Sequence, residues 1–215
     1  MEGVNVSQLK YYAKAFGINL MKFLDRFVDK YNSIFALNPE ESKEVFQKIS
    51  AEMEQKGDLK GAGEVYQKIL KSEPNDVNVL FKLGKTYLNA GQFSEARETL
   101  KKVVVLDSAI AQAFYLLGSA HFALDENQEA MNAFRRAVEL NPGYAEAYYK
   151  MGLIFDVRSE HDEAIAAYQK TISFSPDFVK AYQSLGFAYE SKGMRDEAVK
   201  HFKKAIDIEE RRSGK

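Results

Sequence analysis

Four glycines recur at one fixed interval, and this interval constrains the fold more than any other feature of the sequence. They are Gly84, Gly118, Gly152 and Gly186. A period of roughly 34 residues is typical of stacked supersecondary units, each of which buries its apolar face against its neighbours. We therefore expect an array of similar units rather than one closed domain.

Counting from each glycine as position 8 divides residues 43–212 into units without insertion or deletion. The units are 43–76, 77–110, 111–144, 145–178 and 179–212. Positions 4, 7 and 11 of each unit are mostly large and apolar, and this spacing predicts a first helix. Position 20 is always alanine and position 24 is always large, which predicts a second helix. The two helices are expected to pack as an antiparallel pair.

The small residues in this pattern have a packing role. Glycine at position 8 and alanine at position 20 remove side-chain bulk where the two helices approach most closely, and the large residues fill the space beside that contact. Proline near the end of a unit stops its second helix. Position 15 holds residues that suit the turn between the helices. These are Gly57, Gly91, Asp125, Ser159 and Gly193.

Composition excludes several classes of function. The 30 basic and 31 acidic residues leave a net charge of -1, which argues against non-specific nucleic-acid binding. The absence of cysteine excludes disulfides, thiolate metal sites and cysteine nucleophiles. No apolar run reaches the roughly 18 residues of a membrane-spanning helix, and residues 1–42 lack a signal-peptide pattern. We expect a cytoplasmic protein.

Catalytic and metal-binding motifs are missing from the sequence. His121, His161 and His201 are the only histidines, and they share no helical face and no HExxH motif. The glycines of residues 57–63 do not have the spacing of a phosphate-binding loop. No nucleophile has a base beside it. We therefore predict a protein that is not an enzyme and that uses neither a metal nor another cofactor.

The N-terminal segment, residues 1–42, fits the repeat poorly and is rich in aromatic residues. Its apolar residues from Leu9 to Phe35 form one stripe at helical spacing. Three interpretations are open: the stripe covers the first unit, docks onto another copy of the chain, or lies on a membrane surface. For self-association, the candidate residues are Tyr12, Phe16, Leu20, Phe23 and Phe27.

The first helices are expected to line a concave face on which a peptide or helix could bind. Positions 2, 5, 9, 12 and 13 of each unit point towards this face and are aromatic in the middle units. The alternative is that Phe81, Tyr115 and Tyr149 only pack against neighbouring units. The candidate partner-binding residues are Asn78, Phe81, Lys85, Tyr115, Phe122, Glu146, Tyr149 and Phe187.

Taken together, residues 43–212 resemble the tetratricopeptide repeat (TPR) family. The resemblance implies an all-α fold, a right-handed superhelical solenoid of stacked antiparallel helix pairs. TPR proteins that clamp the C-termini of chaperones use a lysine and an asparagine at positions that here hold Gln47 and Ala51. A role as a co-chaperone is therefore disfavoured.

Within this family, the segment AKAFGINLMKFLDRFVDKYNSIFALNPE is similar to the start of the magnetosome-associated TPR proteins of magnetotactic bacteria. That resemblance implies a scaffold on the cytoplasmic side of the magnetosome membrane. Such a scaffold would form homo-oligomers through its N-terminal segment and bind protein partners in its concave groove. The alternative is a monomeric cytosolic adaptor that binds a peptide or helix in the same groove.

The last second helix is expected to leave part of its apolar face uncovered. Val199, Phe202 and Ile206 lie on that face, and residues 213–215 form a short tail. Solenoids usually place a polar helix over their final apolar face. Either the lysines of this helix supply a polar cap, or this end of the array is a contact surface. The lysines are Lys200, Lys203 and Lys204.

Overall fold

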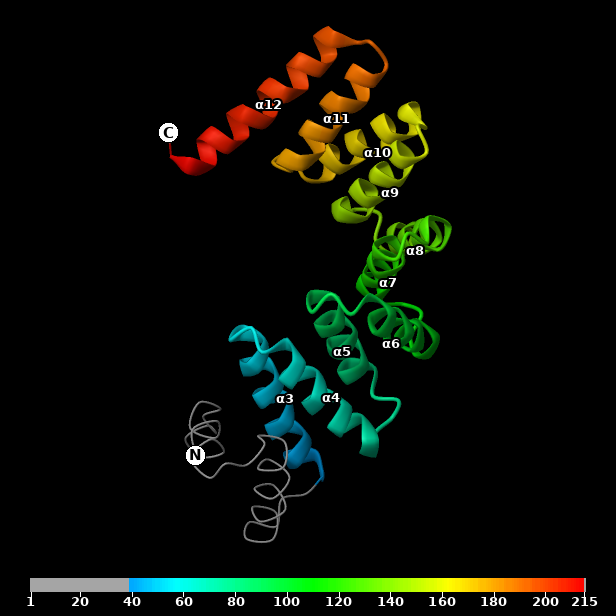
Figure 1. The fold of residues 1–215 in the computed structure, drawn as a ribbon, viewed down its shortest axis with the longest axis vertical. Coiled ribbons are helices and arrows are strands. Elements are labelled where there is room, and N and C mark those ends of the chain that lie inside the picture. The colour runs from blue at the N-terminus through cyan, green and yellow to red at the C-terminus, as the bar shows by residue number, and fades with distance from the viewer. Residues whose placement is uncertain (1–38, 215) are drawn as a thin grey trace. The chain divides into compact units, whose positions relative to one another are not determined.

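The computed structural model describes residues 39–214, and all regular secondary structure within them is α-helical. This confirms the predicted all-α fold. Figure 1 shows the helices with the labels used below. They are α3 (Pro39–Gln55), α4 (Leu59–Ser72), α5 (Val77–Asn89), α6 (Phe93–Leu106), α7 (Ala111–Ala123), α8 (Asn127–Leu140), α9 (Ala145–Val157), α10 (His161–Phe174), α11 (Val179–Ser191) and α12 (Arg195–Ser213).

The chain forms two compact units, one ending at Asp107 and the other beginning at Ser108. In each unit, a first helix packs against the second helix that follows it, and the two run in opposite directions (Figure 1). The second helix then packs against the next first helix, as α4 does on α5 and α10 does on α11. Each second helix inside a unit is therefore covered on two sides.

Within each pair, the glycine at position 8 lies directly against a large side chain of the second helix. A methyl group added to Gly118 would lie 2.7 Å from the ring of Phe134, which is completely buried. The same relation joins Gly84 to Leu100 and Gly186 to Phe202. No larger side chain fits there without displacing the large side chain of the second helix, so the packing role predicted for this glycine is confirmed.

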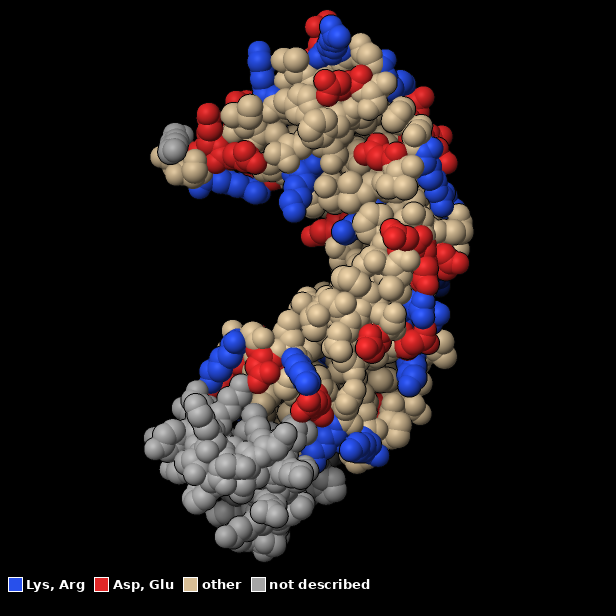
Figure 2. All heavy atoms as spheres, in the orientation of Figure 1, with Lys and Arg blue, Asp and Glu red and all other residues tan. Residues whose placement is uncertain are grey.

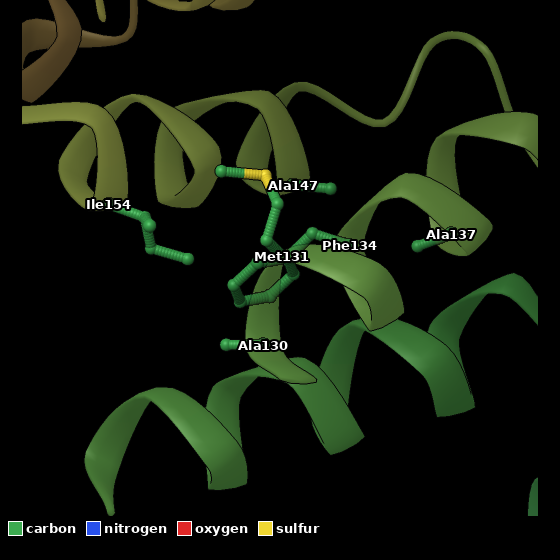
Figure 3. Packing of buried hydrophobic residues seen from close by; sticks show 6 residues of the cluster. All are labelled: Ala130, Met131, Phe134, Ala137, Ala147 and Ile154. Carbon is green, nitrogen blue, oxygen red and sulfur yellow. The ribbon is translucent and has the colours of Figure 1, made fainter. Parts of the chain in front are cut away.

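Apolar side chains of the second helix also form the core between consecutive pairs. Figure 3 shows Met131 of α8 extending towards Ala147 and Ile154 of α9. Met131 and Ile154 are almost completely buried. Removing such a side chain from water contributes about 1.5–3 kcal/mol to stability. Stacking of pairs thus depends on apolar contact between a second helix and the first helix that follows it.

The turn inside each pair places position 15 in the left-handed region of the backbone. Asp125 and Ser159 have φ of 59° and 58° there, although a side chain disfavours this conformation. Glycine meets the same requirement without strain in the other pairs. Those residues are Gly57, Gly91 and Gly193.

We predict that Gly118→Ala destabilises the protein by about 1–2 kcal/mol, because the added methyl group overlaps the ring of Phe134. Gly63→Ala is the matched control, since its added methyl group would make only ordinary contacts, 3.7 Å from Tyr87. Alanine is the better helix former, so the control should gain roughly 0.5–1 kcal/mol. Urea unfolding followed by circular dichroism measures both changes, and equal effects at the two sites would contradict the packing role.

Candidate functional site

The predicted partner-binding residues occupy first helices in both units. In the first unit, Asn78 and Lys85 of α5 are exposed and Phe81 is half-buried. In the second unit, Tyr115, Phe122 and Tyr149 are half-buried, whereas Glu146 and Phe187 are exposed. The candidate self-association residues, Tyr12, Phe16, Leu20, Phe23 and Phe27, lie outside the described residues.

Two of the predicted tyrosines bridge consecutive helix pairs of the second unit. The ring of Tyr115 on α7 stacks on Tyr144, which directly precedes α9, with a centroid distance of 4.9 Å. Tyr149 on α9 lies 5.0 Å from Phe178, which directly precedes α11. Both rings therefore pack against the next pair, as the alternative interpretation expected, and only part of each remains available to a ligand.

The environment of Tyr115 and Tyr144 keeps their hydroxyl groups protonated. Burial raises the pKa of Tyr115, and the negative charge of Glu146 adds to the effect. Burial also raises the pKa of Tyr144 to about 12, with smaller contributions from Tyr115 and Glu146. The hydroxyl groups consequently remain neutral hydrogen-bond donors at any physiological pH.

A pair of lysines adds positive charge to the same surface. The ammonium group of Lys150 on α9 lies 5.3 Å from the ring centroid of Phe122 on α7, a cation–π contact between adjacent first helices. Burial lowers the pKa of Lys150, and the nearby charge of Lys180 on α11 lowers it further. A carboxylate on a bound ligand would offset this repulsion.

Phe187 of α11 is the most accessible of the predicted aromatic residues. Its side chain is 60% exposed, and its ring touches Phe202 edge to face at 5.0 Å. An exposed phenylalanine anchored on one side can bury a large apolar area when a partner binds. We call the residues Tyr115, Phe122, Tyr149, Lys150, Lys180 and Phe187 the first-helix face of the second unit.

Two residues that pack against the first-helix face were missed by the sequence analysis. Tyr144 and Phe178 occupy the last position of their units, in the link between helix pairs. Counting positions within a single helix cannot relate a link residue to the face of the preceding first helix. A signal was present, however, because aromatic residues at positions 5 and 34 occur together in the units 111–144 and 145–178.

Two of the histidines contact side chains of neighbouring elements. The buried ring of His121 contacts the carboxylate of Glu126 through Nδ1 at 2.5 Å, which ties α7 to the start of α8. His201 stacks on Tyr189, with a centroid distance of 5.4 Å. Among residues 39–214, no group of three or more histidine, aspartate or glutamate side chains is placed to hold a metal ion.

Charged groups of both signs are interspersed over the visible surface of the described residues (Figure 2). This distribution does not resemble the single-sign surface that binds nucleic acid. None of the described helices has both the length and the apolar composition that crossing a membrane requires.

Comparison with known proteins supports the assignment to a repeat family. Models of the tetratricopeptide repeat match residues 81–145 and 179–212, and a model described as TPR repeat matches residues 158–193. Among curated proteins, the comparison found no match.

Several solved structures are similar to this one over most of the chain. A crystal structure of MamA is 54% identical in sequence, covers 78% of this chain and 98% of its own, and gives a TM-score of 0.73. A MamA structure from Desulfovibrio magneticus RS-1 is 26% identical, with coverages of 77% and 94% and a TM-score of 0.72. YrrB, described as a TPR protein with an unusual peptide-binding site, is also 26% identical, with coverages of 79% and 89% and a TM-score of 0.64.

The repeat models and the 54% identity to MamA agree with the helix pairs described above. The chain therefore belongs to the MamA family of tetratricopeptide-repeat proteins.

Proposed function

We propose that the chain is a non-catalytic scaffold that assembles with copies of itself and recruits other proteins to the magnetosome membrane. The observation that carries this proposal is the 54% identity to MamA over 98% of that chain. The magnetosome role is the one that the resemblance to the magnetosome-associated TPR proteins implies. The scaffold needs no catalytic group, and its activity consists of holding protein partners together.

Recruitment is assigned to the first-helix face of the second unit. A partner peptide or helix would place an apolar side chain against Phe187 and the exposed parts of Tyr115 and Tyr149. A carboxylate of the partner would lie near Lys150 and Lys180, where it removes the repulsion between the two cations. Aromatic anchors with charged neighbours are typical of the few residues that dominate binding energy at protein interfaces.

The first unit offers a separate and more polar patch on α5. Asn78 and Lys85 are exposed there, and Phe81, which lies between them in the sequence, is half-buried. Exposed amide and ammonium groups contribute direction and specificity more than affinity. We assign this patch a supporting role in partner binding, whereas the aromatic anchors of the second unit supply most of the affinity.

Self-association is assigned to the N-terminal segment. Its apolar stripe includes Tyr12, Phe16, Leu20, Phe23 and Phe27, more aromatic surface than one amphipathic helix needs to pack. An assembly of many copies displays many first-helix faces, and this multivalency strengthens attachment to a membrane that carries the partner. The scaffold would thus lie on the cytoplasmic side of the magnetosome membrane through its partners.

The alternative is a monomeric cytosolic adaptor that binds a peptide or helix through the same face. Its support is the similarity to YrrB, which is described as having an unusual peptide-binding site. The two functions predict different oligomeric states and different attachment to membranes. Measuring these two properties distinguishes the functions.

For self-assembly, we predict that the full chain forms oligomers and that a chain beginning at Pro39, the first residue of α3, is monomeric. The double variant Phe23→Asp with Phe27→Asp should also be monomeric, because charge on the stripe opposes its burial between copies. Lys22→Ala with Arg26→Ala is the matched control, since it changes the same segment at positions outside the apolar stripe. Size-exclusion chromatography with light scattering gives the masses. A monomeric full chain at high micromolar concentration favours the adaptor.

For recruitment, we predict that Phe187→Ser weakens the affinity for purified magnetosomes about tenfold, as expected for the loss of an aromatic anchor. Co-sedimentation measures this affinity. Phe174→Ser on α10 is the control, because Phe174 is also exposed, by 46%, and also packs against a single ring. Circular dichroism and light scattering should show unchanged helicity and mass for both variants. Equal binding of the two variants would place the contact on another face.

A further inference from the structure

On α12, the surface that faces away from α11 has the features of an interface, although no described helix covers it. Val199 and Ile206 are 50% and 52% exposed there. Val199 also lines a hollow of about 600 Å³, together with Asp196 and Lys203. In Figure 1, α11 flanks α12 on one side only. We call Asp196, Val199, Lys203 and Ile206 the outer face of α12.

The equivalent apolar residues elsewhere in the second unit are covered by the following first helix. Ile165 of α10, which is one repeat before Val199, packs with Leu185 and Ala188 of α11. Ile172, which is one repeat before Ile206, packs against the buried cluster that contains Tyr182 of α11, and Val179 packs against the same cluster. Val199 and Ile206 therefore occupy positions that, in the preceding repeat, pack against the following first helix. The contacting residues of that first helix are apolar and lie three residues apart in sequence.

Lys203 occupies a position at which the side chain of other repeats donates a hydrogen bond to the following first helix. Gln169, at the equivalent position of the preceding repeat, donates to the hydroxyl oxygen of Tyr189 on α11 at 3.2 Å. In the first unit, Gln67 donates in the same way to Tyr87 on α5. An ammonium group can only donate, and its charge favours a carboxylate as the acceptor. A helix that covers α12 should carry aspartate or glutamate at the position of Tyr189.

Asp196 occupies a position that contacts the last turn of the covering helix. Asp162, at the equivalent position of the preceding repeat, forms an ion pair with Lys192, which follows α11. Gln128, at the same position of α8, accepts a hydrogen bond from Arg158 at 3.1 Å. Both contacts join a cation directly after the covering helix to an acceptor on the second helix. A helix that covers α12 should therefore be followed by a lysine or arginine that can pair with the carboxylate of Asp196.

We propose that the outer face of α12 binds an amphipathic helix of another protein. That helix carries four apolar residues at intervals of three, a carboxylate directly after the last of them, and a lysine or arginine three residues beyond the carboxylate. The apolar residues cover Val199 and Ile206, the carboxylate pairs with Lys203, and the cation pairs with Asp196. This face is distinct from the first-helix face and adds a second binding site to the scaffold.

The pattern also separates a different protein from a second copy of the chain. None of the chain's own first helices carries a carboxylate at the position that would face Lys203. The residues at that position are Met53, Tyr87, His121, Phe155 and Tyr189. A first helix of a second copy would offer Lys203 at most a tyrosine hydroxyl, as at Tyr87 or Tyr189, and no carboxylate, so charge complementarity favours another protein.

The test uses a fluorescent, lactam-stapled peptide with the sequence of residues 179–194, in which glutamate replaces the residue equivalent to Tyr189. A charge-swapped peptide has lysine at that position and glutamate at the position of Lys192. Fluorescence anisotropy with the full chain should show that the first peptide binds about tenfold more tightly than the second. The double variant Asp196→Lys with Lys203→Glu should reverse this preference. Lys170→Glu, an exposed substitution on α10, should leave it unchanged.

A second arm addresses the apolar contact and the alternative occupant. Ile206→Glu should abolish binding of the first peptide while leaving helicity and the light-scattering mass of the full chain unchanged, because Ile206 is half-exposed. The proposal is overturned if neither peptide binds, if both bind equally, or if the double variant keeps the original preference. A change of mass in Ile206→Glu also overturns it, since that result assigns the outer face to a second copy.

Discussion

Contact between a glycine of the first helix and a large side chain of the second is the constraint on which each helix pair depends. At Gly118 the ring of Phe134 occupies the space that a β-carbon would need. This close approach lets the second helix bury one side within its own pair and present the other side to the next first helix. The repeat thus contains its own rule for stacking, and its exposed surfaces follow from that rule.

Partner binding is built on the residues that the stacking leaves half-covered. Tyr115 and Tyr149 rest on Tyr144 and Phe178, so their rings are held in place before any ligand arrives. A fixed aromatic side chain loses little conformational freedom on binding, which favours affinity. Each ring can therefore pack against the next helix pair and also contact a partner. The interpretation as packing residues and the interpretation as binding residues are compatible.

The two proposed surfaces differ in how their chemistry arises. On the first-helix face, Lys150 and Lys180 lie close enough for the charge of Lys180 to lower the pKa of Lys150, which burial also lowers. On the outer face of α12, Asp196 and Lys203 occupy positions whose counterparts already contact a covering helix. One face is an irregular feature of this chain, whereas the other repeats an internal interface with changed polar residues.

The sequence by itself determined the helix pairs, the glycine contacts and the turn positions, because these depend on spacings within and between units that the regular repeat makes visible. It also pointed to aromatic residues on the first helices. Only the tertiary structure decided how much of each ring is free, since Tyr144 and Phe178 lie in links that no helical spacing relates to Tyr115 and Tyr149. The pairing of Lys150 with Phe122 likewise joins separate helices. Burial and electrostatic coupling between helices arise from their packing in three dimensions, which a pattern along the chain does not contain.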